Sequence, residues 1–185
     1  LEISGSALRD DFTLPLTITI PAGAPSSFVT LLASNDDPLD EPSETVVISI
    51  TGVINGTNAS AAQTVTIEDD NDPPAATLSI GTASINEKTG TTSTPVSVTL
   101  SAASAKTVTV TLSTTGTTVA ADFSLPLTIV ISAGSTVGSV TLVATNDDPL
   151  DEVDETVIMD ISCDLTCNEA TPQQQTVTIV DETDL

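Results

Sequence analysis

An acidic stretch occurs twice in this chain, as NDDPLDEPSE at residues 35–44 and as NDDPLDEVDE at residues 146–155. Position 146 is the counterpart of position 35, and the distance between the two along the sequence is the repeat offset. Each copy follows a run of alternating apolar residues and precedes another, which is typical of a loop between two β-strands. Carboxylates crowded into one loop repel one another, so the stretch predicts a cation among them. Calcium suits such a loop because it takes about six to eight hard oxygen ligands in a flexible geometry.

The residues around the acidic stretches predict an all-β protein. The chain of 185 residues is 39% hydrophobic, with three Phe and no Trp or Tyr, so Val, Ile, Leu, Thr and Ala must fill the core. Abundant Val and Thr favour strands. Alternating segments separated by short turn signals indicate antiparallel β-sandwiches, with no helix of useful length. In the first half of the chain we expect strands over residues 13–20, 28–33, 45–50 and 63–67.

The charge of the chain excludes several classes of function. There are 26 acidic residues against three basic ones, a formal net charge of −23, and no His. A protein that binds nucleic acids or anionic membrane surfaces needs basic patches of its own, so neither is an expected partner of this chain. The absence of His removes the commonest general base and most zinc sites, and we expect no enzyme. No apolar run approaches the roughly 20 residues of a membrane-spanning helix, so no membrane insertion is expected in this segment.

The repeat divides the chain into two units. Residues 121–129 (ADFSLPLTI) repeat residues 10–18 (DDFTLPLTI) at the same repeat offset. We predict a partial sandwich at residues 1–72, a Pro-rich linker at 73–75 and a complete sandwich at 76–185. Leu1 aligns with Leu112, so the first unit lacks the counterpart of residues 76–111. Two explanations stay open: the chain is a window on a longer repetitive protein, or a neighbouring chain donates the missing strands and builds a head-to-tail fibre.

Three motifs of the second unit resemble the Calx-beta domain, the calcium-binding β-sandwich of sodium–calcium exchangers and of many bacterial surface proteins and adhesins. They are Asp-Phe at 122–123, DDPLDEVDE at 147–155 and TVTIVDE at 176–182. The resemblance covers the whole second unit and the latter two-thirds of the first. It implies tandem Ig-like sandwiches of seven strands, the first incomplete at its N-terminal side. It also implies that loops and the acidic segment after the last strand bind calcium at one end.

The resemblance implies a set of calcium ligands in each unit, and the first unit has no counterpart of Glu87. Asp40, Asp151 and Asp154 are expected to be solvated loop charges instead. The ligands expected in the second unit are Glu87, Asp122, Asp147, Asp148, Glu152, Glu155, Asp181, Glu182 and Asp184. The ligands expected in the first unit are Asp11, Asp36, Asp37, Glu41, Glu44, Asp69, Asp70 and Asp72.

Two further features concern covalent chemistry. Cys163 and Cys167 lie four residues apart in an expected loop, where a local disulfide would suit an extracellular protein. Asn55 and Asn58 each begin an Asn-X-Ser/Thr sequon in a polar loop, which allows glycosylation. Ordinary turn chemistry explains the same residues, because Asn-Gly is a strong turn dipeptide.

Taken together, these features predict a non-enzymatic, extracellular, calcium-binding structural protein. It would serve as a rigid spacer or subunit of a cell-surface adhesin, matrix or filament, with assembly by strand complementation as one route. Its expected partners are calcium ions and neighbouring copies of the same repeat, in the same chain or in other subunits. The alternative is a regulatory calcium-sensor domain of a larger membrane or signalling protein, in which calcium must bias a two-state element.

Overall fold

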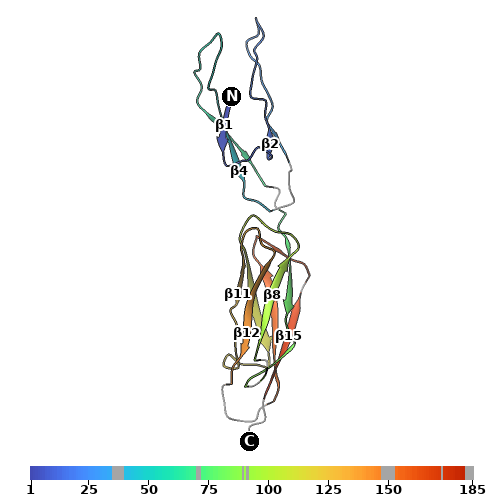
Figure 1. The fold of residues 1–185 in the computed structure, drawn as a ribbon. Helices are drawn as coiled ribbons and strands as arrows, with labels where there is room; N and C mark the ends of the chain where they lie inside the picture. Colours follow the sequence, from blue (N-terminus) through green and yellow to red (C-terminus); the bar gives the residue numbers. More distant parts are fainter. Residues whose placement is uncertain are drawn as a thin grey trace. The chain divides into compact units, whose positions relative to one another are not determined.

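The computed structural model describes residues 1–34, 40–69, 72–88, 90, 92–146, 153–171 and 173–181. The chain forms two compact units, Leu1–Asn71 and Asp72–Leu185. Every regular element in the described part of the chain is a β-strand (Figure 1), which confirms the all-β prediction. None of the described residues belongs to a helix that is long and apolar enough to span a membrane.

The first unit contains one small sheet and one short strand pair. Among its described residues, the buried apolar ones are Phe12, Leu14 and Val46. The antiparallel three-stranded sheet has the order β1-β4-β5, with β1 at Glu2–Gly5, β4 at Glu44–Ser49 and β5 at Gln63–Ile67. The separate antiparallel pair joins β2 (Phe12–Thr13) to β3 (Leu32–Ala33).

The second unit is a sandwich of two five-stranded sheets. One sheet has the order β10 (Phe123–Ser124), β12 (Val137–Ala144), β8 (Ser93–Leu100), β6 (Ala75–Ile80) and β14 (Asn168–Glu169). The other has the order β11 (Thr128–Ile131), β9 (Val108–Gly116), β13 (Glu155–Cys163), β15 (Gln174–Val180) and β7 (Ser84–Asn86).

The core of the second unit follows from the period of two along its strands. Val96, Val98 and Leu100 of β8 are buried, and Val108 and Val110 of β9 are buried with them. Successive side chains of a strand point to opposite faces, so the intervening Thr and Ser residues stay at the surface of the sandwich. Each buried Val or Leu stabilises the fold by about 1.5–3 kcal/mol relative to leaving it in water.

Two details of this sandwich differ from the expectation. The edge pairs β14–β6 and β15–β7 are parallel, because alternation along a strand carries no information about the direction of its neighbour. Among the described residues its two sheets together hold ten strands, of which β7, β10 and β14 have only two or three residues. Without these three, the seven strands implied by the resemblance remain.

The first unit forms less strand than its sequence predicts. Residues 17–20 and 26–31 belong to no strand, although their counterparts in the second unit form β11 and most of β12. The expected strands at 13–20 and 28–33 are therefore wrong except near Phe12–Thr13 and Leu32–Ala33. In the second unit β11 pairs with β9 and β12 pairs with β8. The counterparts of those partners are missing from the first unit, apart from the short β1.

Candidate metal site at one end of the second unit

The parallel pairing of β7 with β15 places Glu87 near Asp181. Asn86, the last residue of β7, lies opposite Val180, the last residue of β15. The amide N–H of Glu87 donates to the carbonyl oxygen of Val180 at 3.4 Å. Because parallel strands end at the same edge of a sheet, the carboxylates that follow them leave from one end of the sandwich. Both side chains are half-buried.

Glu155 joins this end from the neighbouring strand. It is the first residue of β13 and lies opposite Ile179 of the antiparallel β15. Ile179 is two residues before Asp181 in the chain, so β13 begins where β15 ends. The Glu155 side chain is also half-buried.

Asp122 comes from the loop that leads from β9 to β10. The amide of Thr117 donates to the carbonyl oxygen of Thr156 at 3.0 Å, which ties the loop to the start of β13. The amide of Thr145 donates to the carbonyl oxygen of Asp122 at 2.7 Å, which ties its other end to the residue after β12. The Asp122 side chain is only 4% exposed, and its Oδ2 accepts a hydrogen bond from the amide of Val119. A carboxylate removed from water in this way needs compensating donors or cations.

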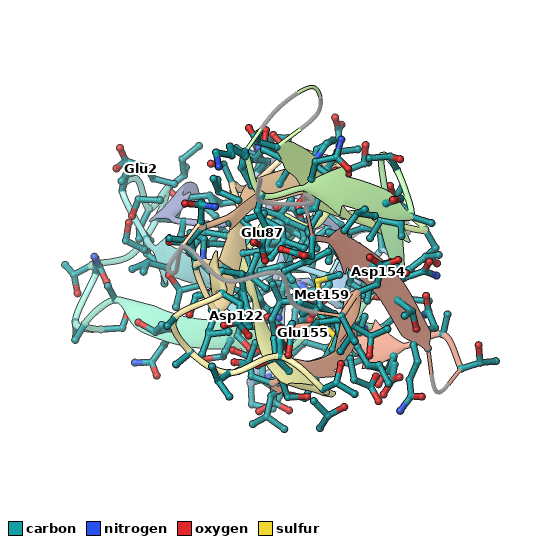
Figure 2. All side chains as sticks on the ribbon, turned by 90° about the horizontal axis from the view of Figure 1, so that it is seen from below. Glu2, Glu87, Asp122, Asp154, Glu155 and Met159 are labelled. Atoms are coloured by element: carbon teal, nitrogen blue, oxygen red, sulfur yellow. A yellow bond between two sulfur atoms is a disulfide. The ribbon has the colours of Figure 1, made fainter. Side chains whose placement is uncertain are left out.

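Four carboxylates from four separate elements thus lie at one end of the second unit. Figure 2 shows Glu87, Asp122 and Glu155 towards the middle of its view. Within the described ranges, no group of three or more His, Cys, Asp or Glu side chains could hold a metal ion. The described carboxylates by themselves therefore do not make a calcium site. The other expected ligands of this unit lie outside the described residues: Asp147, Asp148, Glu152, Glu182 and Asp184.

The first unit repeats the arrangement around Asp122 at Asp11. Asp11 is buried, and its Oδ2 accepts a hydrogen bond from the amide of Leu8. The carbonyl oxygen of Asp11 accepts the amide of Ser34 at 2.8 Å. The repeat offset relates these three residues to their counterparts Val119, Asp122 and Thr145. The same local sequence has therefore built the same buried aspartate twice.

The remaining expected ligands of the first unit are only partly brought together. The amide of Glu41 donates to Oδ1 of Asp69 at 3.2 Å. Glu44 begins β4 opposite Ile67, the last residue of β5, two residues before Asp69. Asp72 is exposed and belongs to the second unit. Asp36, Asp37 and Asp70 lie outside the described residues.

The burial of Asp40 contradicts the prediction from the sequence. Asp40 was expected to be a solvated loop charge, but its side chain is 1% exposed. Asp154 is exposed as expected, and Asp151 lies outside the described residues. Nothing in the sequence separates Asp40 from its acidic neighbours, because the burial of a loop carboxylate depends on how the loop folds against its unit.

The two cysteines form a disulfide between Cys163, the last residue of β13, and Cys167. Cys167 is buried, while Leu165 between them is exposed. Asp164 accepts hydrogen bonds from both the hydroxyl and the amide of Thr166. The hydroxyl has the larger effect, and together they lower the pKa of the Asp164 carboxyl below its ordinary value.

Both sequon asparagines are exposed in the loop between β4 and β5. The side-chain amide of Asn58 donates to the carbonyl oxygen of Ile50 at 2.8 Å, and its Oδ1 accepts the amide of Ser60 at 3.0 Å. Asn55 has a positive φ of 59°, which is the turn geometry that Asn-Gly favours.

No protein-family model and no curated protein sequence matches the chain. Among solved structures, the apo form of the Calx CBD1 domain has a TM-score of 0.46 and 18% identity, covering 59% of this chain and 99% of that chain. A two-domain protein of unknown function from Bacteroides fragilis has a TM-score of 0.49 and 10% identity, covering 61% of this chain and 47% of that chain. The calcium-binding domain CBD12 of CALX1.1 has a TM-score of 0.45 and 21% identity, with 54% and 41% covered. The chain spans less than half the length of the latter two.

Proposed function

We propose that this chain is a calcium-binding structural module, a rigid spacer or subunit of an extracellular adhesin, matrix or filament. The observation that carries the proposal is that Glu87, Asp122, Glu155 and Asp181 are all placed at one end of the second unit. In the sequence, the acidic stretch at 146–155 follows β12, which ends at Ala144, and reaches Glu155, the first residue of β13. Carboxylates at one end of the fold repel one another. A calcium ion bound among them would be attracted to each carboxylate and would offset that repulsion.

Calcium in this role stabilises the folded units. An ion that binds the folded chain and not the unfolded one adds about 2.7 kcal/mol at a hundredfold excess over its dissociation constant. For a unit of this size, that corresponds to a rise in melting temperature of roughly 10 °C. Most ligands would come from the acidic stretch and from the residues after Asp181, with Asp122 and Glu155 completing the shell.

A structural role outside the cell suits the rest of the chain. The second unit carries a disulfide, a bond typical of oxidising compartments. The buried aspartate and the acidic stretch recur in both units at the same repeat offset, as in proteins that are built from tandem structural repeats. The chain contains no His to act as a general base, and we propose no catalytic activity for it.

The test compares thermal unfolding and calorimetric titration of the full chain in millimolar calcium and in chelator. The variant Asp122→Asn/Glu155→Gln removes two proposed ligand charges, and Asp154→Asn is the matched control at an exposed acid nearby. We expect calcium to raise the melting temperature of the wild type and of the control by roughly 10 °C, and that of the double variant by much less. Identical melting curves with calcium and with chelator, together with no heat of binding, would overturn the proposal.

A further inference from the structure

The outer edge of β6 in the second unit is covered by the segment that joins β13 to β15. We name the described residues of this segment, 164–171 and 173, the edge clip. Within it the short strand β14 lies parallel to the start of β6, with Asn168 opposite Ala75. The other side of β6 pairs with β8. A strand at the edge of a sheet presents unpaired backbone groups, and the edge clip pairs with several of those on β6.

Backbone amides of the edge clip donate to the outer edge at its start. The amide of Asn168 donates to the carbonyl oxygen of Pro74 at 2.9 Å, and the amide of Ala170 donates to that of Ala76 at 3.2 Å. The side-chain amide of Asn168 also donates to the carbonyl oxygen of Pro73 at 3.3 Å. The edge clip therefore holds the residues that lead into β6 as well as the strand itself.

The side chain of Gln173 covers the next part of β6. Its amide nitrogen donates to the carbonyl oxygen of Ala76 at 2.9 Å, and its Oε1 accepts the amide of Leu78 at 2.7 Å. The backbone amide of Gln173 donates to Oε1 of Glu169 at 3.0 Å, which ties this residue to β14. A side chain that imitates a strand in this way blocks the addition of another one.

The disulfide fixes the place where the edge clip begins. Cys163 is the last residue of β13, and Cys167 immediately precedes β14. Cys167 is buried in the core cluster of the unit, whereas Leu165 within the closed ring is exposed. A strand of two residues makes few hydrogen bonds, and each contributes little net stability. The position of β14 therefore depends on the covalent bond next to it.

We propose that the Cys163–Cys167 disulfide is a redox-sensitive latch for the outer edge of β6. The oxidised latch holds β14 and Gln173 against β6 and blocks the pairing of this edge with another strand. In the reduced chain the edge clip opens locally, and the backbone groups of Ala76 and Leu78 become accessible. The latch is closed in oxidising compartments and open in reducing ones. This role is independent of calcium and of the proposed function.

The latch closes by thiol–disulfide exchange with an oxidant that itself contains a disulfide, such as oxidised glutathione. The two cysteine thiols lose two protons and two electrons as the S–S bond between Cys163 and Cys167 forms. The S–S bond of the oxidant breaks and takes up these protons and electrons, which gives two thiols. Opening is the reverse exchange with a thiol reductant.

The test follows amide hydrogen exchange of the full chain, oxidised and in a thiol reductant, at several low concentrations of urea. A local opening exposes little surface, so exchange through it hardly depends on urea, whereas exchange through global unfolding does. We expect the reductant to accelerate exchange of the Ala170 and Leu78 amides roughly tenfold or more by an opening that does not depend on urea. The Leu112 amide on β9 of the other sheet donates to the carbonyl oxygen of Leu127 and is the reference, which should keep its dependence on urea. Oxidised glutathione should restore slow exchange at Ala170 and Leu78.

Two variants separate the disulfide from the contact that it positions. Cys163→Ser/Cys167→Ser should exchange like the reduced wild type and should not respond to the reductant. Gln173→Ala keeps the disulfide but lacks the acceptor of the Leu78 amide. In this variant the Leu78 amide should exchange rapidly in both redox states, while the Ala170 amide should still respond to the reductant.

Two results would overturn the proposal. The first is exchange of the Ala170 and Leu78 amides that the reductant leaves unchanged. The second is acceleration of these amides only by the urea-dependent route that they share with Leu112. In that case the disulfide would stabilise the whole unit without controlling the edge of β6.

Discussion

The carbonyl oxygen of Thr156 lies 2.0 Å from the position that a Cβ atom on Gly116 would occupy. Gly116 also has a φ of 128°, a backbone conformation that side chains rarely allow. The first unit has the same relationship, with Gly5 at a φ of 120° and its virtual Cβ 2.1 Å from the Thr45 carbonyl oxygen. In both units this glycine lets the chain approach the neighbouring strand just before the loop that holds the buried aspartate.

Replacing Gly116 with Ala should destabilise the second unit by about 2–4 kcal/mol, since β9 must move away from β13 and the backbone is strained. Urea unfolding measures the loss. Gly134→Ala is the control: Gly134 has a φ of 77°, but nothing lies within 4 Å of its virtual Cβ. It should cost only about 1 kcal/mol. Equal losses for the two variants would contradict the role given to the Thr156 carbonyl.

Asp122→Ala should destabilise the second unit by about 1–3 kcal/mol even in chelator, because the amide of Val119 loses its buried acceptor. Denaturant unfolding without calcium separates this loss from any effect of the ion. Asp154→Ala, at an exposed position, should change stability by less than about 0.5 kcal/mol. A calcium-free Asp122→Ala as stable as the wild type would show that its hydrogen bond contributes nothing to the loop.

Gln173→Ala should expose the edge of β6. The change removes the hydrogen bonds to Ala76 and Leu78, and we expect a loss of about 1–2 kcal/mol. Hydrogen exchange of the Leu78 amide should accelerate more than that of any other amide in β6. Gln174→Ala, which removes an exposed contact with Asp160, should leave the Leu78 amide unchanged. Unaltered exchange at Leu78 in Gln173→Ala would refute the edge-covering role.

Loss of the disulfide should lower the stability of the second unit. The double variant Cys163→Ser/Cys167→Ser opens a loop with a sequence separation of four. The chain-entropy estimate for so short a loop is about 2 kcal/mol. A thiol reductant should lower the melting temperature of the wild type by a similar amount and leave the double variant unaffected. A wild type indifferent to the reductant would contradict a stabilising bond.

The pKa of Asp164 should rise towards its ordinary value in Thr166→Val, because this variant removes the hydroxyl donor that contributes most to lowering it. Thr166→Ser, which keeps the hydroxyl, should retain the lowered value. A pKa below its unfolded value adds stability above the unfolded pKa, and that stability is lost as pH falls through the folded pKa. The loss of stability that Asp164 causes on acidification should therefore be smaller in Thr166→Val and be complete at a higher pH. Carbon-13 NMR titration of the Asp164 carboxyl measures the pKa directly, and an unchanged value would refute the role of the hydroxyl.

Several parts of the fold were predictable because they depend on local pattern. The alternation of Val96, Val98 and Leu100 specifies which face of β8 enters the core. The Asp-Phe motif at 122–123 identified Asp122 as an expected ligand, and the structure shows that this side chain is buried. Asp40 was wrongly expected to be solvated, since a short acidic loop has the same local pattern whether or not one of its carboxylates turns inward.

The sequence by itself determined the all-β class and the two similar units, because a period of two and an internal repeat are properties of the chain alone. The tertiary structure decided which strands are neighbours. The parallel pairing of β7 with β15 brings Glu87 near Asp181, and no alternation pattern encodes that direction. It also decided that residues 128–131 form a strand whereas the similar residues 17–20 do not. A strand exists only where a partner satisfies its backbone hydrogen bonds, and the partner is a distant part of the chain or another molecule.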